Sequence, residues 1–93
     1  MNLKFRVTDK ATGEVTFREG IFNNLINGDI QIDQYTGKHD IDGIEIYEGD
    51  TVTHRIYNAK KIKTLYDFFE ALEDVRKWGW RGDGEKLGFK VIK

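Results

Sequence analysis

Five acidic residues close together in the middle of the chain are the first candidates for a chemical role: Asp40, Asp42, Glu45, Glu48 and Asp50. Calcium needs several oxygen ligands around one point, and an EF-hand loop supplies them at alternating positions before a glycine at the sixth. Here Gly43 follows Asp42 directly, so the spacing does not fit that loop. We interpret the segment as solvated turns, because Asp-Gly is a favoured turn pair.

The two histidines, His39 and His54, are the second candidates, for a metal or a general-base site. They fall on different predicted elements and lack the helical spacing of a metal motif. The chain contains no serine and no cysteine, which excludes a Ser or Cys nucleophile. A Gly-rich phosphate loop is also missing. The sequence therefore predicts no catalytic residue, no metal, no cofactor and no enzymatic activity.

Basic residues beside a tyrosine form a candidate nucleic-acid site: Arg55, Tyr57, Lys60, Lys61 and Lys63. Small barrels bind single strands by stacking bases on aromatic rings beside basic side chains. The formal net charge is −1, so the chain lacks the general basic excess of such proteins. Nucleic-acid binding is kept as the alternative hypothesis.

A protein-binding surface is the leading hypothesis. A glycine-rich turn carries Trp78, Trp80 and Arg81, and exposed aromatic residues are frequent interface anchors. The preceding segment has four acids that would present a negative surface to a basic partner: Asp67, Glu70, Glu73 and Asp74. The plain alternative is a solvated acidic face with both tryptophans in the core, and the sequence leaves this open.

These candidates depend on elements that the residue pattern predicts. Apolar residues alternate with polar ones on either side of Gly13, which predicts a β-hairpin over residues 2–18. Asn27-Gly28 indicates a turn, and a short strand follows from Ile30. Further strands are expected around Ile44 and Ile46, over residues 51–57, and at Leu87, Phe89 and Val91, with Glu45 and Tyr47 facing outward.

A helix over residues 64–78 is the strongest prediction. Thr64 has the hydroxyl of an N-cap, and Asp67 stands where a capping box has its second member. Gly79 suits the position after the helix. One apolar stripe is expected to face the core: Leu65, Phe68, Phe69, Leu72 and Val75. Residues 58–63, before the helix, are expected to be a polar connector.

Together the elements predict one domain over residues 1–93, of the α+β class and mainly β. The architecture is a small SH3-like barrel or a strongly bent antiparallel sheet, with one helix and a final strand. Aromatic residues make up 13% of the chain, enough to build a core from few positions. No apolar run is long enough to span a membrane.

The central stretch also carries a family resemblance. Its residues are Gln34-Tyr35-Thr36-Gly37, Asp40, Asp42-Gly43, Glu45-Ile46-Tyr47-Glu48-Gly49-Asp50 and Val52. This pattern, with Lys4-Phe5-Arg6 and Asp9-Lys10 near the start, resembles the YopX-like family of small phage and prophage proteins of Gram-positive bacteria. Lys38 and Thr8 depart from it. The resemblance implies a mostly-β fold and a mobile-element origin, and it transfers no catalytic residue.

The expected function is therefore that of a non-enzymatic phage or prophage accessory protein. It would act in the cytoplasm of the bacterial host by binding a host or defence-system protein, as an inhibitor or modulator. Binding of nucleic acid through a small barrel is the alternative. The oligomeric state is not determined by the sequence.

Overall fold

The computed structural model describes residues 4–19 and 30–92. Within these ranges the chain forms seven strands, one α-helix and a short 3-10 helix. Their bounds are β1 (Lys4–Asp9), β2 (Val15–Glu19), β3 (Ile30–His39), β4 (Glu45–Tyr47), β5 (Thr51–His54), β6 (Tyr57–Lys61), α1 (Leu65–Lys77), η1 (Gly84–Lys86) and β7 (Lys90–Ile92). The expected turn at 27–28 lies outside the described residues.

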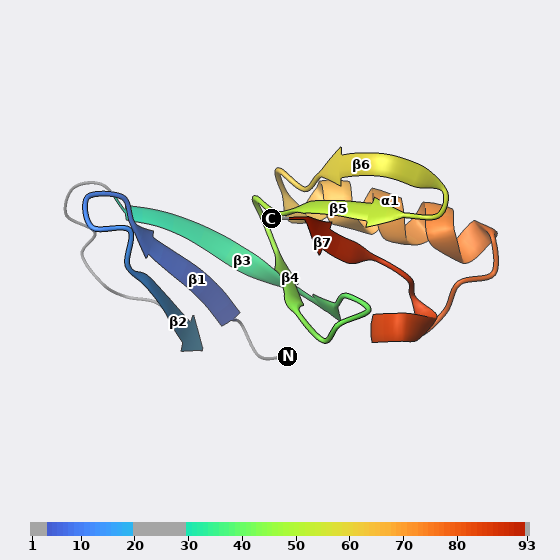
Figure 1. The fold of residues 1–93 in the computed structure, drawn as a ribbon, viewed down its shortest axis with the longest axis horizontal. Helices are drawn as coiled ribbons and strands as arrows, with labels where there is room; N and C mark the ends of the chain where they lie inside the picture. Colours follow the sequence, from blue (N-terminus) through green and yellow to red (C-terminus); the bar gives the residue numbers. More distant parts are fainter. Residues whose placement is uncertain (1–3, 20–29, 93) are drawn as a thin grey trace.

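The strands form two antiparallel sheets at the two ends of an elongated molecule of 43 × 27 × 22 Å. One sheet has the order β2-β1-β3-β4, and the other has the order β6-β5-β7 and lies against α1 (Figure 1). The expected mainly β fold with a single α-helix is confirmed. The described strands do not close into a barrel, so the SH3-like alternative is not confirmed.

The predicted hairpin is confirmed as β1 and β2, and Gly13 has the positive φ of 78° that its turn requires. Directly paired residues of antiparallel strands point to the same face. Arg6 pairs with Phe17, and Val7 pairs with Thr16. The apolar residues of the two strands therefore lie on opposite faces: Val7 is 8% exposed, whereas Phe17 is 56% exposed.

The main core lies between α1 and the second sheet. Thr64 and Asp67 form the predicted capping box, and Gly79 follows the helix with a φ of 99°. Three residues of the predicted stripe are buried with Ala71, but Phe69 is 51% exposed, so its assignment to the core was wrong. The buried cluster consists of Ile46, Val52, Ile62, Phe68, Ala71, Leu72, Val75, Leu87, Phe89 and Val91.

Two further expectations are corrected. Tyr47 was expected to face outward but is 2% exposed, because β4 lies between the two halves of the molecule and is covered on both faces. Residues 51–57 were expected to be one strand, but a turn at Arg55 ends β5 and the chain folds back as β6. The supposed connector supplies most of β6, whose pairing with β5 satisfies backbone groups that one isolated strand would leave free. None of the described helices is long and apolar enough to cross a membrane.

Gly88 offers a test of packing at the end of the second sheet. It has a φ of 86°, and a Cβ there would lie 2.9 Å from His54 Nε2 and 3.1 Å from the Trp80 ring. We expect Gly88→Ala to lower the free energy of unfolding by about 3 kcal/mol, because backbone strain and overpacking add. Urea denaturation measures this difference.

Gly79→Ala is the matched control, since Gly79 also has a positive φ, but nothing lies within 4 Å of the Cβ that the substitution would add. It should lose only about 1 kcal/mol. Equal losses in the two variants would contradict the packing of His54 and Trp80 against Gly88.

Candidate functional site

The corner formed by Glu48, Gly49 and Asp50 contacts β1, β3 and the start of α1. Gly49 takes a φ of 90°, and the Glu48 carboxylate accepts hydrogen bonds in two directions. Its Oε1 accepts from the Gln34 backbone N–H of β3 at 2.9 Å, and its Oε2 accepts from Leu65 N–H at 3.2 Å. Because Leu65 begins α1, the carboxylate also lies at the favourable end of the helix dipole. One side chain thus joins the first sheet to the helix.

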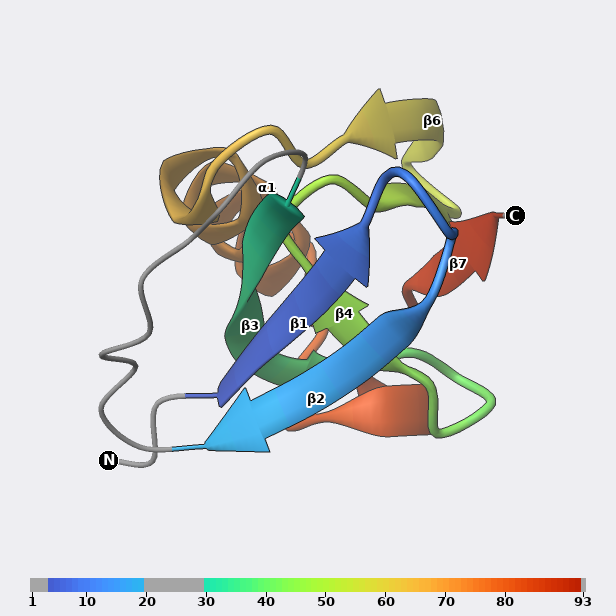
Figure 2. The ribbon, with the colours of Figure 1, turned by 90° about the vertical axis from the view of Figure 1, so that its left-hand side faces the viewer.

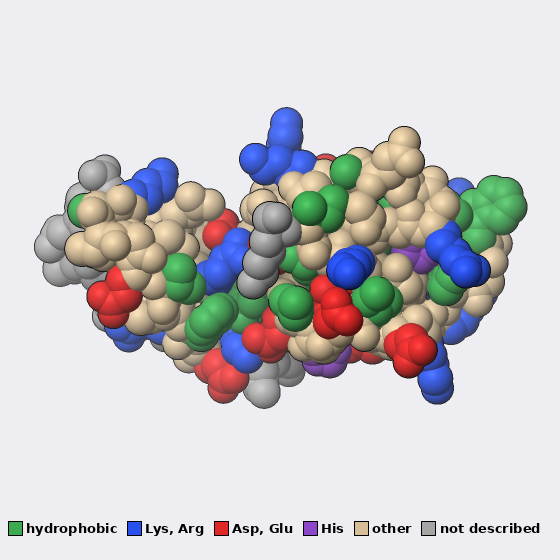
Figure 3. All heavy atoms as spheres, viewed as in Figure 1, with side chains coloured by type: hydrophobic (Ala, Val, Ile, Leu, Met, Phe, Trp, Pro, Cys, Tyr) green, Lys and Arg blue, Asp and Glu red, His purple; other side chains and the backbone are tan. Residues whose placement is uncertain are grey.

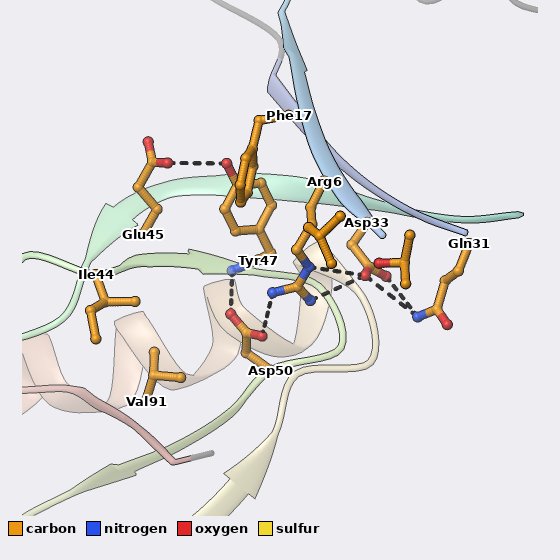
Figure 4. Close-up of a pocket in the computed structure, with 11 residues that line it drawn as sticks. Arg6, Phe17, Gln31, Asp33, Ile44, Glu45, Tyr47, Asp50 and Val91 are labelled. Atoms are coloured by element: carbon orange, nitrogen blue, oxygen red, sulfur yellow. Dashed lines mark hydrogen bonds and ion pairs between the residues drawn. The ribbon is translucent and has the colours of Figure 1, made fainter. Parts of the chain in front are cut away.

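Arg6 reaches the same corner from β1 (Figure 4). Its Nη1 donates to Asp50 Oδ1 at 2.8 Å, and its Nη2 donates to Asp33 Oδ2 at 3.1 Å. The same nitrogen donates to the Glu48 carbonyl at 3.1 Å, and the guanidinium lies 5.1 Å from the centre of the Tyr47 ring. Burial by itself would lower the pKa of Arg6, but Asp50 and Asp33 outweigh it and raise that pKa. Arg6 is therefore always charged.

A pocket of about 610 Å³ opens beside this cluster, between the two sheets. Figure 4 shows the Phe17 and Tyr47 rings close together next to Arg6, and their centres are 5.7 Å apart. On the surface, hydrophobic and charged side chains alternate around this part of the molecule (Figure 3). The lining consists of Arg6, Thr8, Val15, Phe17, Gln31, Asp33, Ile44, Glu45, Tyr47, Asp50 and Val91.

The charged groups around the pocket are already paired with one another. Glu45 accepts from Lys4 Nζ at 2.7 Å and from the Tyr47 hydroxyl at 3.1 Å. Burial and the Glu45 carboxylate raise the pKa of Tyr47, so its phenol stays neutral. Asp50 accepts from Tyr47 N–H in addition to Arg6. Such an arrangement can hold an apolar group, but it presents no activated base or nucleophile.

Asp40, the first acid of the central stretch, is fully buried and binds backbone only. Its Oδ1 accepts from Asp42 N–H at 2.8 Å and from Ile44 N–H at 2.9 Å. Its Oδ2 accepts from Val91 N–H of β7 at 3.0 Å. The carboxylate thus fixes the turn and fastens it to the second sheet, in keeping with the turn interpretation of this segment. The absence of a bound metal stays a prediction.

The two histidines serve separate parts of the fold. His39 lies on the surface, and its Nδ1 is 2.9 Å from Asp83 Oδ2. His54 is buried, its Nε2 lies 2.8 Å from the Leu87 carbonyl oxygen, and its ring stands edge-on to Trp80. Each ring nitrogen named here has a structural partner, so the structure does not bring the two histidines into one site.

The outer side of α1 carries aromatic and acidic residues. Tyr66 is 69% exposed and Phe69 is 51% exposed, and residues three apart on a helix are neighbours. Glu70 and Glu73 are exposed beside them. We call Tyr66, Phe69, Glu70 and Glu73 the helix face. Its acids were predicted from the sequence but its two rings were not: Phe69 was assigned to the apolar stripe, and Tyr66, which lies off that stripe, was the signal that could have revealed the face.

The other two acids of the candidate set have structural roles. Asp67 accepts from the backbone N–H groups of Lys63 and Thr64 as part of the helix cap. Asp74 is half-buried beside Tyr57. Only Glu70 and Glu73 therefore remain as candidate contacts for a partner.

The tryptophan turn, residues 78–83, divides its aromatic residues between surface and core. Trp78 is 74% exposed. Trp80 packs against the core, with its ring centre 4.7 Å from that of His54. Arg81 donates to the carbonyls of Arg76 and Trp80, where a cation suits the C-terminal end of the helix. Trp78 is thus the aromatic side chain of this turn that is available for contact, and Arg81 of the same turn is also exposed.

The basic residues of the nucleic-acid hypothesis do not gather on one face. Lys60 and Lys61 are successive residues of β6, and successive side chains of a strand point to opposite faces. The Tyr57 hydroxyl donates to the Ala71 carbonyl at 3.0 Å, and Lys60 Nζ lies 5.9 Å from its ring centre. Arg55 and Lys63 are exposed before and after this strand. Tyr57 is consequently not a free stacking surface.

The model of the YopX protein family matches residues 5–91, nearly the whole chain. The chain belongs to the YopX protein family. The expected resemblance is confirmed and extends beyond the central stretch to α1 and β7, which the sequence analysis did not assign to it. Membership indicates a phage-type protein. No curated protein and no solved structure matches the chain significantly.

Removing Arg6 should weaken the joint between the sheets. Its side chain is 23% exposed, and those of Asp33 and Asp50 are 9% and 11% exposed. We expect Arg6→Met to lower the free energy of unfolding by about 2–3 kcal/mol, because two largely buried carboxylates lose their cation. Chemical denaturation of this YopX protein measures the loss.

Lys4→Met is the matched control, since Lys4 lies on the same strand and pairs with Glu45 nearer the surface. Its loss should be clearly smaller. A loss as large as that of Arg6→Met would show that the ion pairs of Arg6 stabilise the fold no more than the ion pair of Lys4 does.

Because of Tyr57, we expect the free energy of unfolding to depend on pH in the alkaline range. Burial, together with the nearby Asp74 carboxylate, raises the pKa of Tyr57 from 10.0 to about 12. The folded state therefore holds this proton more tightly than the unfolded chain, and the free energy of unfolding should fall as the pH rises through that window. Unfolding measured below, within and above the window tests this. Tyr57→Phe should show a smaller fall, and an equal fall in both proteins would contradict the assignment.

Proposed function

We propose that this YopX protein is a non-enzymatic accessory protein that binds a host or defence-system protein in the bacterial cytoplasm. The observation that supports this is the exposure of large aromatic side chains on and after α1. Tyr66, Phe69 and Trp78 are 69%, 51% and 74% exposed. An interface that covered them would remove a large apolar area from water.

These exposed rings contrast with the apolar residues of α1 that pack into the core. Phe68 and Val75 of the same helix are fully buried, so α1 already packs one face against the second sheet. Phe69 lies on the flank of this buried face, with its ring centre 6.5 Å from that of Phe68, and about half of it stays exposed. Exposed apolar surface rimmed by polar residues is typical of interaction sites.

Charge favours a basic partner. Glu70 and Glu73 flank Tyr66 and Phe69, and neither takes part in the helix cap that occupies Asp67. Acidic groups at the rim of an interface speed the encounter with a basic protein and disfavour nucleic acid. The proposed partner surface therefore has a hydrophobic centre with lysine or arginine around it.

Nucleic-acid binding is the weaker alternative. Arg55, Lys61 and Lys63 are exposed and supply cations. The side-chain alternation of β6 divides its lysines between two faces, and Tyr57 is held by Ala71. Neither feature suits a continuous groove that would bind a single strand of DNA or RNA.

A partner captured from host lysate, identified and then purified, would allow the helix face to be tested by calorimetry. We expect Phe69→Ala and Trp78→Ala each to weaken binding about tenfold or more, as anchor residues do. Glu70→Lys should weaken it further as salt is lowered, because the introduced charge repels a basic surface.

Ile41→Ala is the control, since Ile41 is also exposed, at 41%, but lies in the turn after β3. It should bind as the unaltered protein does. The absence of any stoichiometric partner, or equal loss in all variants, would contradict the proposal. Binding of single-stranded DNA or RNA that weakens steeply with salt would instead favour the alternative.

A further inference from the structure

Among the residues that the structure describes, the outer edge of β2 is open. β2 is the terminal strand of its sheet, and no strand of the described residues pairs with its other side. All five of its residues are exposed. Figure 2 shows β2 beside β1, along the margin of the sheet. Natural proteins usually protect such an edge with proline, charged side chains or a bulge; the stretch Val15–Glu19 has no proline and no bulge, and its charges are confined to Arg18 and Glu19 at one end.

The pairing with β1 determines which residues of β2 direct their backbone N–H and C=O groups toward the open edge. Asp9 N–H donates to the Glu14 carbonyl at 2.9 Å, so Glu14 directs its carbonyl toward β1. Backbone groups of successive strand residues point to alternate sides. Thr16 therefore also faces β1, whereas Val15 and Phe17 direct their N–H and C=O groups toward the open edge.

The sequence of this edge is complementary to itself. If a second copy pairs antiparallel about a two-fold axis through Thr16, Val15 lies opposite the partner's Phe17, and Phe17 lies opposite the partner's Val15. These are the residues with outward-facing backbone groups, so both pairs form hydrogen bonds in register. A two-fold interface requires this kind of self-match.

The side chains match in the same register. Val15 and Phe17 share the face that lines the pocket, so each strand sets an apolar residue opposite an apolar residue. Glu14, Thr16 and Arg18 share the other face. There Glu14 lies opposite the partner's Arg18, and by symmetry the same ion pair forms a second time. A register centred on Phe17 would instead place Val15 opposite the partner's Glu19, which loses these matches.

We propose that the protein forms a two-fold homodimer by pairing β2 with β2 of a second copy, centred on Thr16. The first sheet then continues through the axis into its partner. The contact is short, so the dimer is a reversible one that forms at raised protein concentration. It lies on the first sheet, away from the helix face on α1, and it is independent of the function proposed above.

Exchange of the two charges tests the register. Glu14→Lys sets lysine opposite arginine twice, and Arg18→Glu sets glutamate opposite glutamate twice. Each variant alone should be monomeric at concentrations where the unaltered protein is a dimer by sedimentation velocity. An equimolar mixture should regain a dimer, because the introduced lysine of one copy then faces the introduced glutamate of the other. The remaining Arg18 and Glu14 pair as they do in the unaltered protein.

Native mass spectrometry of the mixture should show the heterodimer as the main dimeric species. Because this outcome requires both variants to be folded, it also covers the contact that Arg18 makes within its own chain. Trp78→Ala is the control and should dimerise normally. A protein that stays monomeric at about 1 mM overturns the proposal. So does dimerisation of both single variants without preference for the mixed pair.

Discussion

The structure depends on the paired charges at the corner formed by Glu48, Gly49 and Asp50. Arg6 binds Asp33 of its own sheet and Asp50 at the entrance to the second sheet. Glu48 adds a bond to the first residue of α1. Asp40 and His39 add polar contacts to Val91 and Asp83 in the other half, and the main apolar core lies in only one half. The guanidinium of Arg6, held between carboxylates that are largely shielded from water, is thus one of several links that fix the relative placement of the sheets.

The acids of the central stretch are likewise occupied by hydrogen bonds within the fold. Asp40, Glu48 and Asp50 each accept backbone N–H groups from other segments or from the turn itself. A carboxylate that is occupied in this way stabilises a turn and is poorly placed to bind a cation or move a proton. In this YopX protein the buried polar groups support the fold, so a function is better sought on the surface.

The two candidate contact surfaces lie at opposite ends of the molecule. The helix face and Trp78 belong to the half built on α1, and the open edge of β2 belongs to the other half (Figure 1). Binding of a partner at one end leaves the other free. A dimer formed through β2 would present two copies of the helix face, and two linked sites bind a multivalent partner more tightly than either alone.

The sequence by itself determined the local elements. The capping box at Thr64 and the glycine corners follow from backbone and side-chain preferences that need no distant contact. The alternation at Leu87, Phe89 and Val91 predicted the last strand, of which only Lys90–Ile92 forms β7. The motif around Gln34 and Asp50 also identified the family. For the same reason the helix was placed correctly to within a residue at each end.

Only the tertiary structure decided which side of each element is covered. Tyr47 is buried because β4 lies between two layers, and Phe69 is exposed because the second sheet covers only part of the helix. Phe17 lies beside Arg6 because the hairpin register set them opposite each other. Alternation and helical spacing say which residues share a face, but the neighbour that covers that face comes from another part of the chain. The candidate surfaces are the faces left uncovered, so they could be seen only once the elements were assembled.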